Sequence, residues 1–467
     1  MNGIHSWGVY VPFGRLERKA IADALGAPAG SGTRVVASYD EDTTSMGVEA
    51  ARLAVRTGPP PAALVFATSA PAYLDKTNAT AIHAALDLAD ATPAYDMAGS
   101  IRSGAGAMWA ALHMNAPTLV VVSDLRTGLA GGSDEREGGD GAAAFVCGPG
   151  DAEHPLAADM IGSASVTAEF LERWRQPGDV ASRQWEERFG EQVYVPLGEG
   201  ALKEALKTAG ITADRIDRLI VAGPHGRANK RVAGSAGVKK EAVADDFGSV
   251  VGNTGTAHAG LMLADALDRA APDQILCVVS LADGADVSVW RTTGAVAKAR
   301  PARTVADQIT GGRAVSYPTF LTWRGFLTRE PPRRPDPERP AAPPSYRAER
   351  WKFAFTGSRC GACQTRQVPP QRVCVHCQAI DRMTRERMAD VPATIATFTV
   401  DRLAYSLSPP VVAAVIDFDG GGRFQCELTD VDPKAVKIGD RVEMTFRRLF
   451  TASGVHNYFW KARPVRG

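Results

Sequence analysis

The sequence predicts a layered α/β domain over residues 1–300, followed by a linker, a metal-binding ribbon and a small β-barrel. Three observations support this prediction. Apolar strand-like runs alternate with helical patterns through the first domain, which is typical of layered α/β folds. A proline-rich stretch then precedes two Cys-x-x-Cys pairs, and the chain ends in short β-rich runs separated by turn residues.

The first domain shows the alternation directly. Its apolar runs have the composition of buried strands, and they fall at 63–67, 118–123, 218–222 and 275–280. Helical patterns lie between or beside them, at 46–56, 78–88, 104–114, 199–209 and 257–270. A Rossmann-type fold would give a similar alternation, but no Gly-x-Gly-x-x-Gly motif follows a strand near the N-terminus.

The remainder of the chain divides into three segments. Residues 301–350 are predicted to be a helical and proline-rich linker, and the seven prolines within 328–346 argue against a helix or a central strand there. We place the ribbon at 351–385 and a barrel of OB type at 386–467. The barrel prediction depends on five β-rich runs, at 393–400, 410–417, 423–429, 441–446 and 457–462.

The two cysteine pairs predict a zinc site. Cys360 and Cys363 form the first pair, Cys374 and Cys377 the second, and ten residues separate the pairs, enough for a short hairpin. Four thiolates complete a tetrahedral shell with no open position, so a structural Zn²⁺ is favoured over a catalytic one. Iron would fit the same shell, whereas a redox-active Cys-x-x-Cys is disfavoured by the presence of two pairs. His376 is expected to be an exposed ribbon residue.

Composition narrows the function classes. The chain has 467 residues and a formal net charge of +1, which gives no electrostatic reason to expect nucleic acid or a membrane as partner. The first residues do not resemble a signal peptide, and no apolar run of about 18 residues predicts a membrane-spanning helix. Paired cysteines of metal-site spacing, with the other three isolated, indicate a reducing compartment, and we expect a cytoplasmic protein.

The ribbon and barrel resemble the OB-fold proteins with a rubredoxin-like zinc ribbon that accompany thiolase-type acyl-CoA enzymes. The resemblance covers roughly 316–467. It is carried by the two Cys pairs and by Phe320–Gly325, Trp351-Lys352, Gly357–Cys360 and Pro369-Pro370. Because such modules usually associate with a separate enzyme subunit, a thiolase-type partner protein is a further expectation, although here the module is fused to its apparent partner.

The first 300 residues resemble the 3-hydroxy-3-methylglutaryl-CoA synthase and ketoacyl synthase branch of the thiolase superfamily. The matching segments occur in the family's order, at Gly3–Pro12, Asp40–Ala51, Gly139–Ala144 and Gly252–Ala257. This resemblance implies a five-layered α/β/α/β/α thiolase fold of two similar halves, a homodimer, and a coenzyme A thioester as substrate. The residues that would contact coenzyme A are not predicted.

The same resemblance allows the family's catalytic residues to be sought one by one. The nucleophilic Cys falls on Ile101, at a strand-to-helix elbow, and the general-base Glu falls on Ser69. The family His matches His225 and the family Asn matches Asn253. In the family that pair hydrogen-bonds the thioester oxygen and stabilises an enolate, so nucleophile and base are missing while the oxyanion pair remains.

Enolate stabilisation without a nucleophile suits an acyl-CoA carbon–carbon lyase of aldol type, which needs a general base but no acyl-enzyme. The candidate bases are His225, His258, Tyr73, Tyr95 and Asp96. Other interpretations of nearby residues stay open: Ser100 or Ser103 as substitute nucleophile, or as partners of the helix start; Arg102 at a CoA phosphate, or solvated; Met108 and Trp109 in the core.

Two alternatives to the lyase remain at this stage. One is a Claisen-type acyltransferase like 3-hydroxy-3-methylglutaryl-CoA synthase, with a substitute nucleophile. The other is a non-catalytic scaffold that holds a thiolase-type partner protein. The acyl group and the direction of the reaction are not readable from the sequence.

Overall fold

The structure is a computed structural model that describes residues 2–28, 30–333, 335 and 337–465. The chain divides into two compact units. The first comprises Met1–Ala37, Asp42–Thr80 and Asp90–Tyr317, and the second comprises Ser38–Glu41, Ala81–Ala89 and Pro318–Gly467. Each unit is described by itself below.

The first unit is built on a nine-stranded mixed sheet with the order β11-β12-β13-β8-β1-β7-β6-β4-β5. One half consists of β1 (Asn2–Tyr10), β7 (Gly141–Pro149), β6 (Thr118–Asp124), β4 (Ala63–Thr68) and β5 (Ala94–Ala98). The other half consists of β8 (Ala158–Thr167), β13 (Gly284–Thr292), β12 (Ile275–Leu281) and β11 (Arg218–Ala222). The halves meet where β1 pairs with β8, at Gly3 and Ile4.

The two halves repeat one pattern. In the first, β6 pairs antiparallel with β7 and parallel with β4, which pairs parallel with β5. In the second, β12 pairs antiparallel with β13 and parallel with β11, and an isolated parallel bridge from Leu219 to Val243 occupies the position of a further strand. The predicted fold of two similar halves is therefore confirmed.

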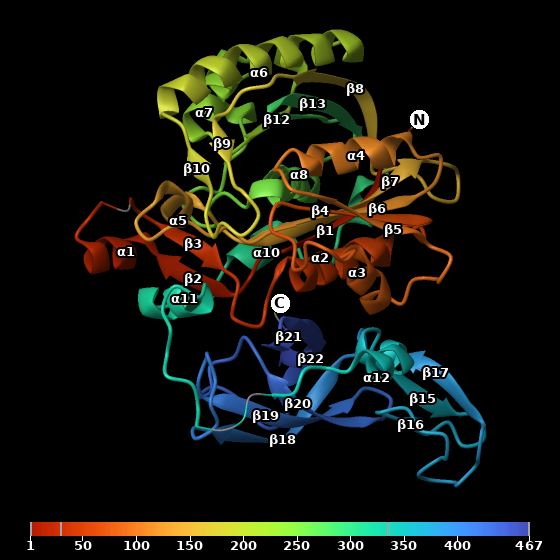
Figure 1. Cartoon of the computed structure of the whole chain (residues 1–467). Coiled ribbons are helices and arrows are strands. Elements are labelled where there is room, and N and C mark those ends of the chain that lie inside the picture. Colours follow the sequence, from red (N-terminus) through yellow and green to blue (C-terminus); the bar gives the residue numbers. More distant parts are fainter. Residues whose placement is uncertain (1, 29, 334, 336, 466–467) are drawn as a thin grey trace. The chain divides into compact units, whose positions relative to one another are not determined.

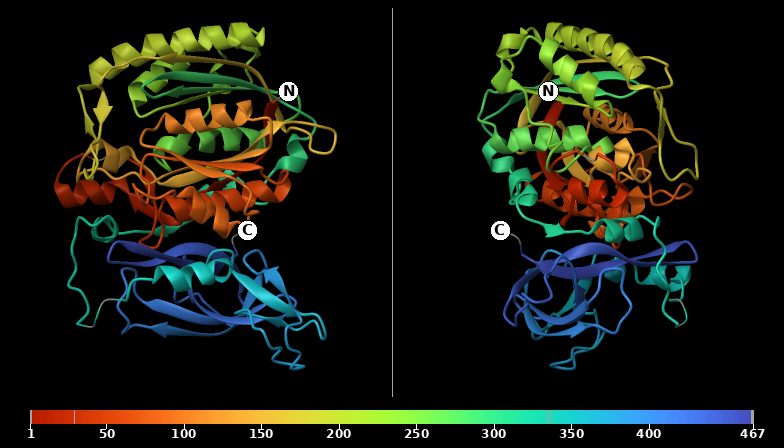
Figure 2. Two further views of the ribbon diagram at one scale, coloured as in Figure 1. Left: turned by 45° about the vertical axis from the view of Figure 1, so that its right-hand side comes forward. Right: turned by 90° about the vertical axis from the view of Figure 1, so that its left-hand side faces the viewer.

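Helices complete the five layers of this unit. Helices α4 (Ser103–His113) and α8 (His258–Arg269) lie between the two halves of the sheet (Figures 1 and 2). Helices α6 (Glu187–Ala209) and α7 (Gly226–Ser235) cover the outer face of the second half, and α2 (Thr43–Thr57) packs on the first (Figure 1). Small residues permit this close packing: a Cβ on Gly104 would lie 2.8 Å from the carbonyl oxygen of Thr256.

Shorter elements extend this unit beyond residue 300. The parallel pairing of β14 (Arg313–Ala314) with β2 (Gly14–Glu17) joins the end of the unit to its beginning. The other short elements are α1 (Arg18–Leu25), β3 (Thr33–Val36), α5 (Ser133–Glu137), β9 (Arg173–Trp174), β10 (Arg183–Gln184), α9 (Val296–Ala299) and α10 (Val305–Ile309). Helix α3 (Ala79–Ala85) crosses the boundary between the two units.

The second unit contains the predicted ribbon and barrel. A three-stranded sheet of β16 (Arg366–Gln367), β15 (Thr356–Cys360) and β17 (Met383–Arg387) forms the ribbon. The five barrel strands all form, and they close in the order β18-β19-β20-β22-β21. Their bounds are β18 (Ala393–Asp401), β19 (Val411–Phe418), β20 (Arg423–Leu428), β21 (Arg441–Ala452) and β22 (Val455–Pro464).

The segment before the ribbon differs from expectation. Helix α11 (Tyr317–Trp323) precedes it, and residues 334 and 336 of the proline-rich stretch lie outside the described residues. The expectation that 328–346 contains no helix is wrong, because α12 (Ala342–Arg347) begins there and is followed by α13 (Glu349–Lys352). The prolines of α12 lie in its first turn, where a backbone N–H would have no acceptor within the helix, so the absence of this N–H in proline costs nothing there. No helix of the described residues is both long and apolar enough to cross a bilayer.

Candidate functional site

The strand-to-helix elbow forms as the sequence predicts. Strand β5 ends at Ala98, and Gly99 follows with φ of 121°, a conformation that favours glycine. The Gly99 N–H donates to the Thr68 carbonyl across 3.0 Å, and the Ser100 Oγ accepts from the Arg102 N–H at 3.1 Å. Ser100 thus satisfies backbone at the start of α4, and Ile101 lies at the tip of the turn between two cavities.

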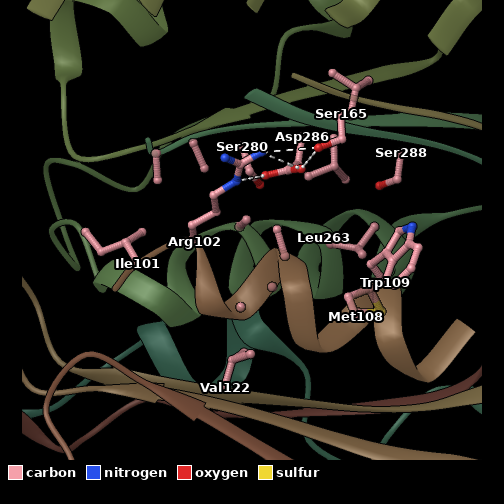
Figure 3. A pocket seen from close by; sticks show the side chains of 18 of the residues that line it. Ile101, Arg102, Met108, Trp109, Val122, Ser165, Leu263, Ser280, Asp286 and Ser288 are labelled. Carbon is pink, nitrogen blue, oxygen red and sulfur yellow. Dashed lines mark hydrogen bonds and ion pairs between the residues drawn. The ribbon is translucent and has the colours of Figure 1, made fainter. Parts of the chain in front are cut away.

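The larger cavity, of about 340 Å³, is mainly apolar and runs from Ile101 along α4 and α8 (Figure 3). Its volume falls within the range of small-molecule sites. Alkyl, thioether and aromatic side chains form most of the wall: Met108, Trp109, Leu112, Val122, Phe145, Met160, Leu263, Val278, Val287 and Trp290. Trp109 is 60% exposed, so the expectation that it belongs to the core is wrong.

One corner of this cavity is polar. The Arg102 guanidinium contacts both Asp286 oxygens, with Nε at 2.9 Å and Nη2 at 3.3 Å, and the Ser165 Oγ donates to Asp286 Oδ1 across 2.6 Å (Figure 3). Arg102 also donates to the carbonyl oxygens of Asp283 and Val166. These contacts hold Arg102 in an ion pair rather than on a freely solvated face, and its contact with a CoA phosphate stays a prediction.

The smaller cavity, of about 90 Å³, also borders the elbow and is polar. It brings together Ile101 and Ser69, the residues at the expected Cys and Glu positions. Its other polar walls come from Ser100, Arg126, Arg173, Arg175, Ser182, Tyr194 and Asp283.

Ser69 is tied to a buried carboxylate, Asp124, at the end of β6. The Ser69 Oγ donates to Asp124 Oδ2 across 2.8 Å, and the Ser69 N–H donates to Oδ1 across 2.8 Å. The Thr256 N–H and Oγ1 also donate to Oδ2, both at 2.8 Å, and Thr68 donates to Oδ1. Gly255 leaves room for this carboxylate, because a Cβ there would lie 2.2 Å from Oδ2. Asp124 therefore joins the end of β4 to the segment 252–257 that contains Asn253.

His225 caps a helix and contacts main-chain atoms through both ring nitrogens. Its Nδ1 accepts from the Ala228 N–H at 3.1 Å at the start of α7, and its Nε2 lies 2.8 Å from the Glu187 carbonyl oxygen. An accepting Nδ1 assigns the proton to Nε2. The ring is buried under α6, where a Cβ on Gly190 would lie 2.7 Å from it.

Asn253 is likewise bonded to backbone. Its Nδ2 donates to the Gly223 carbonyl across 2.8 Å, and its Oδ1 accepts from the Gly255 N–H across 2.9 Å. Asn253 thereby holds the carbonyl of Gly223, which lines the apolar cavity, while the next residue, Pro224, lines the polar one. Neither of the two is among the described residues that line either cavity.

The other candidate bases are not among the described residues that line either cavity. The Asp96 carboxylate accepts from the Asn78 and Ala79 N–H groups at 2.7 Å, so it organises the start of α3. Tyr73 belongs to the same loop and is joined to Asn78 through its backbone. Tyr95 is exposed on β5. Burial lowers the pKa of His258 to about 4, and its Nδ1 faces the Thr254 N–H at 3.3 Å.

Asp283 and Glu172 are acidic residues that sequence analysis missed. Asp283 lines the polar cavity from the β12–β13 turn, with φ of 47°, and burial raises its pKa. Burial also raises the pKa of Glu172, beside His225, and Glu172 Oε2 has no hydrogen-bond partner among the described residues. The Asp283-Gly284 turn signal was present in the sequence. No sequence motif marks Glu172, Arg173 or Arg175.

The four predicted zinc ligands converge in the ribbon. Their Sγ atoms all lie within 4.8 Å of one another, with 3.6 Å between Cys360 and Cys377 and 3.5 Å between Cys363 and Cys374. Zn–S bonds of about 2.3 Å place tetrahedral sulfurs about 3.8 Å apart, so the donor set fits Zn²⁺. The His376 and Cys377 N–H groups point at the Cys374 Sγ, at 3.4 and 3.5 Å, as in the second shell of a thiolate site.

The repeated half-sheets, the helix pair between them and the elbow define a thiolase-fold domain. The solved structures that resemble it show the same fold. One is titled "MvaS in complex with 3-hydroxy-3-methylglutaryl coenzyme A", with a TM-score of 0.59 and 20% identity over 72% of this chain and 94% of that one. An HMG-CoA synthase complexed with CoA gives 0.60 at 14% identity, covering 69% and 89%. The 3-oxoacyl-[acyl-carrier-protein] synthase III of Aquifex aeolicus VF5 gives 0.55 at 19%, covering 62% and 100%.

Sequence relatives narrow this class to one family. The hydroxymethylglutaryl-CoA synthase of Aeropyrum pernix is 32% identical over 344 residues, which cover 70% of this chain and 94% of the relative. That of Caldivirga maquilingensis is 28% identical over 70% of this chain and 98% of the relative. The chain belongs to the hydroxymethylglutaryl-CoA synthase family. Its C-terminal part matches "ChsH2, rubredoxin-like zinc ribbon domain" at residues 353–380 and "ChsH2, C-terminal OB-fold domain" at 386–447.

Proposed function

We propose that the thiolase-fold unit binds a coenzyme A thioester and makes or breaks a carbon–carbon bond by aldol chemistry, without transferring the acyl group to the protein. The observation that carries this proposal is the position of Ile101. Its alkyl side chain occupies the elbow, at the end of a 340 Å³ apolar cavity large enough for an acyl group. A solved structure of the same fold is a complex with CoA, which supports a thioester ligand.

The chemistry needs a base and a stabilised enolate. In the cleavage direction, a base removes the β-hydroxyl proton of a 3-hydroxyacyl thioester, the C–O bond becomes a carbonyl, and the Cα–Cβ bond breaks. Its electron pair passes to Cα and forms the thioester enolate, which a proton then quenches. We assign the base to Asp283, because its carboxyl lines the polar cavity beside Ile101 and burial raises its pKa toward the range useful for proton transfer.

His225 and Asn253 receive a positioning role in this proposal. Their polar atoms hydrogen-bond to main-chain groups, so a direct bond to the substrate oxygen would require those contacts to be exchanged. Asn253 fixes the carbonyl of Gly223 at the wall of the apolar cavity, and His225 joins the start of α7 to Glu187 of α6. The direct enolate role that the family resemblance implies stays a prediction.

The variants His225→Asn and His225→Ala separate these roles. Asn is a good N-cap, so we expect His225→Asn to keep most of the stability, whereas Ala costs about 1 kcal/mol through the lost cap. If His225 only positions the turn, turnover should follow stability and recover in the Asn variant. If the ring touches the thioester oxygen, both variants should lose kcat alike.

The first experiment is a thermal-shift panel on the zinc-loaded chain with free CoA and with short, aromatic and polycyclic acyl-CoAs. A ligand that binds only the folded state raises Tm as its concentration exceeds Kd. The 3-hydroxyacyl-CoA of the class that shifts Tm is then tested for cleavage by mass spectrometry of both products. Turnover that is lost in Asp283→Asn, without any acyl adduct on the intact protein, would support the proposal.

Two other functions have specific support. The relatives are hydroxymethylglutaryl-CoA synthases, which favours an acyltransferase with a substitute nucleophile such as Ser100. That function predicts a stable or transient acyl adduct in the intact mass.

The backbone-bonded His225 and Asn253 favour a non-catalytic scaffold for a thiolase-type partner protein. A scaffold predicts no CoA-ester shift in well-folded protein and no effect of Asp283→Asn on the partner's turnover.

A further inference from the structure

The larger cavity has two walls of opposite character. On the strand side it is lined by the hydroxyl groups of Ser163 on β8, Ser280 on β12 and Ser288 on β13, together with the Asp286 carboxylate. Figure 3 shows Ser280, Asp286 and Ser288 on this side, whereas Trp109 lies on the helix side. We call Ser163, Ser280, Asp286 and Ser288 the polar wall.

Strand pairing places these four side chains in one patch. Ser288 lies directly opposite Ser163, and Asp286 lies directly opposite Ser280. Directly opposed residues project from the same face of a sheet, as do residues two apart on one strand. Asp286 and Ser288 are therefore neighbours on that face, about 7 Å apart along β13. The backbone register, not a mobile loop, fixes the polar wall.

The polar wall keeps unused hydrogen-bonding capacity. The hydroxyls of Ser163 and Ser280 have no hydrogen-bond partner among the described residues. The Ser288 Oγ accepts from Trp290 Nε1 across 2.8 Å, which leaves its own proton to donate. A hydroxyl that faces an apolar space without a partner loses the bonds it would make in water. A ligand that carries a polar group at this place would restore them.

The length of the cavity tells where that group would lie. The lining residues of α4 run from Gly104 to Leu112, a rise of about 12 Å, and Ile101 lies at the elbow before them. Beyond Ser288 the strand side becomes apolar again at Trp290, which also lines the cavity. An apolar group that extends from the elbow parallel to α4 would therefore meet the polar wall along its edge, not at its far end.

We propose that the polar wall recognises a hydroxyl group on the apolar part of the acyl group, beyond the carbons that react at the elbow. A serine hydroxyl donates and accepts, so it complements a ligand hydroxyl in either role. The Asp286 carboxylate only accepts, and its charge opposes an anion, so a neutral donor is favoured over a carboxylate. The assignment to an acyl group rests on the proposed function, whereas binding of a hydroxyl-bearing apolar molecule does not.

The first test uses two ligands that differ only by a hydroxyl, 4-ethylphenol and ethylbenzene, titrated calorimetrically into the full zinc-loaded chain. We expect the double variant Ser163→Ala/Ser288→Ala to raise the Kd of 4-ethylphenol about three- to tenfold, the value of a neutral hydrogen bond. The Kd of ethylbenzene should stay the same or fall, because the variant makes the wall more apolar. Ser280→Ala should act in the same direction with a smaller change.

The control is Ser235→Ala, whose hydroxyl bonds within α7 and lies outside both cavities as the described residues define them. It should change neither Kd. A variant that merely loosened the domain would weaken both ligands alike, so the difference between the two ligands carries the test. An equal change for both ligands, or no binding of 4-ethylphenol to wild type, would overturn the proposal.

A second measurement links the hydroxyl to the acyl group. The affinity for 3-(4-hydroxyphenyl)propionyl-CoA is compared with that for 3-phenylpropionyl-CoA. We expect the hydroxylated ester to bind more tightly, with the preference lost in Ser163→Ala/Ser288→Ala. Ester binding that is indifferent to the hydroxyl and to the serines would overturn this inference and leave the proposed function standing. Serine-dependent binding of 4-ethylphenol without any CoA-ester binding would support the hydroxyl site and remove the proposed function.

Discussion

The Ser69 hydroxyl donates to Asp124 Oδ2 across 2.8 Å, at the position that the family resemblance assigns to a general-base Glu. A small hydroxyl here satisfies a buried carboxylate that also receives bonds from Thr68 and Thr256. A glutamate at residue 69 would place a second carboxylate against Asp124, and like charges at short range repel strongly in a buried setting. The local hydrogen-bond network therefore favours a hydroxyl at residue 69 and disfavours a carboxylate there.

This relationship predicts the stability of variants at Ser69. Ser69→Ala removes one donor from Asp124 and should lower the free energy of unfolding by about 1–2 kcal/mol. Ser69→Glu should lower it more, because it adds an uncompensated charge. Urea unfolding followed by tryptophan fluorescence measures both. The control is Ser235→Ala, because the Ser235 hydroxyl bonds only to its own helix. A Ser69→Glu variant as stable as wild type would contradict the proposed effect of the hydrogen-bond network.

Placing a cysteine at residue 101 tests whether the elbow activates a thiol. In Ile101→Cys the thiol would lie at the start of α4, beside the arginine-lined cavity, and both features should lower the pKa of the thiol from its usual value near 8.5. We expect faster iodoacetamide alkylation at pH 7 than for the buried Cys147 and Cys277. An acyl adduct from an acyl-CoA should appear in the variant alone. Alkylation no faster than that of the buried thiols would show that the elbow does not activate a thiol.

His258 predicts a pH dependence of stability. Burial lowers the pKa of the ring from 6.5 to about 4, so between these values the unfolded chain binds a proton that the folded chain does not. Stability is therefore complete above pH 6.5 and declines as pH falls toward 4, by up to about 3 kcal/mol from this group. His258→Gln should flatten this part of the profile. Burial raises the pKa of Asp268 to about 6, so this group makes the folded chain more stable as the pH falls, opposite to His258. The quantity to compare is therefore the difference in unfolding free energy between wild type and His258→Gln at each pH.

The ribbon predicts zinc-dependent stability. Cys374→Ser removes a thiolate from the four-sulfur cluster and should reduce bound zinc from about one equivalent to nearly none, with a lower Tm. A chelator should have the same effect on wild type. Cys426→Ser, in the barrel and outside the cluster, should retain the metal. Full zinc content in Cys374→Ser, measured by elemental analysis, would refute a four-cysteine site.

The family resemblance predicts a homodimer, and variants on β5, at one edge of the nine-stranded sheet, test this prediction. Strand β5 is an edge strand, and Tyr95 on it is 58% exposed, as Trp109 is 60% exposed on the adjoining α4. Large exposed aromatic groups are enriched at interfaces. Tyr95→Glu with Trp109→Glu should convert a dimer to a monomer in light scattering, whereas Trp185→Glu, equally exposed at 60%, should not. A wild-type monomer at micromolar concentration would refute the dimer.

The sequence alone determined the order of the helices and strands, and it pointed to the metal-binding cysteines and to residues 69 and 101. Strand and helix periodicity predicted the layered domain, and the five β-rich runs all became barrel strands. Cysteine spacing predicted the metal cluster, since ligands close in sequence are close in space. The family resemblance assigns Ile101 and Ser69 to the positions of the nucleophile and the base, and that assignment stays a prediction.

Only the tertiary structure decided what the side chains contact. His225 and Asn253 matched a motif, but their hydrogen bonds to Glu187 and Gly223 depend on the approach of α6 and of the end of β11, which are distant in sequence. The small polar cavity brings Arg126 together with Arg173 and Arg175 near Ser69, from two segments far apart in the sequence, so no periodicity or spacing could reveal it. The pattern of residues along the chain predicts backbone conformation and burial. Which charged side chains from distant segments come together is decided by the packing of the whole domain.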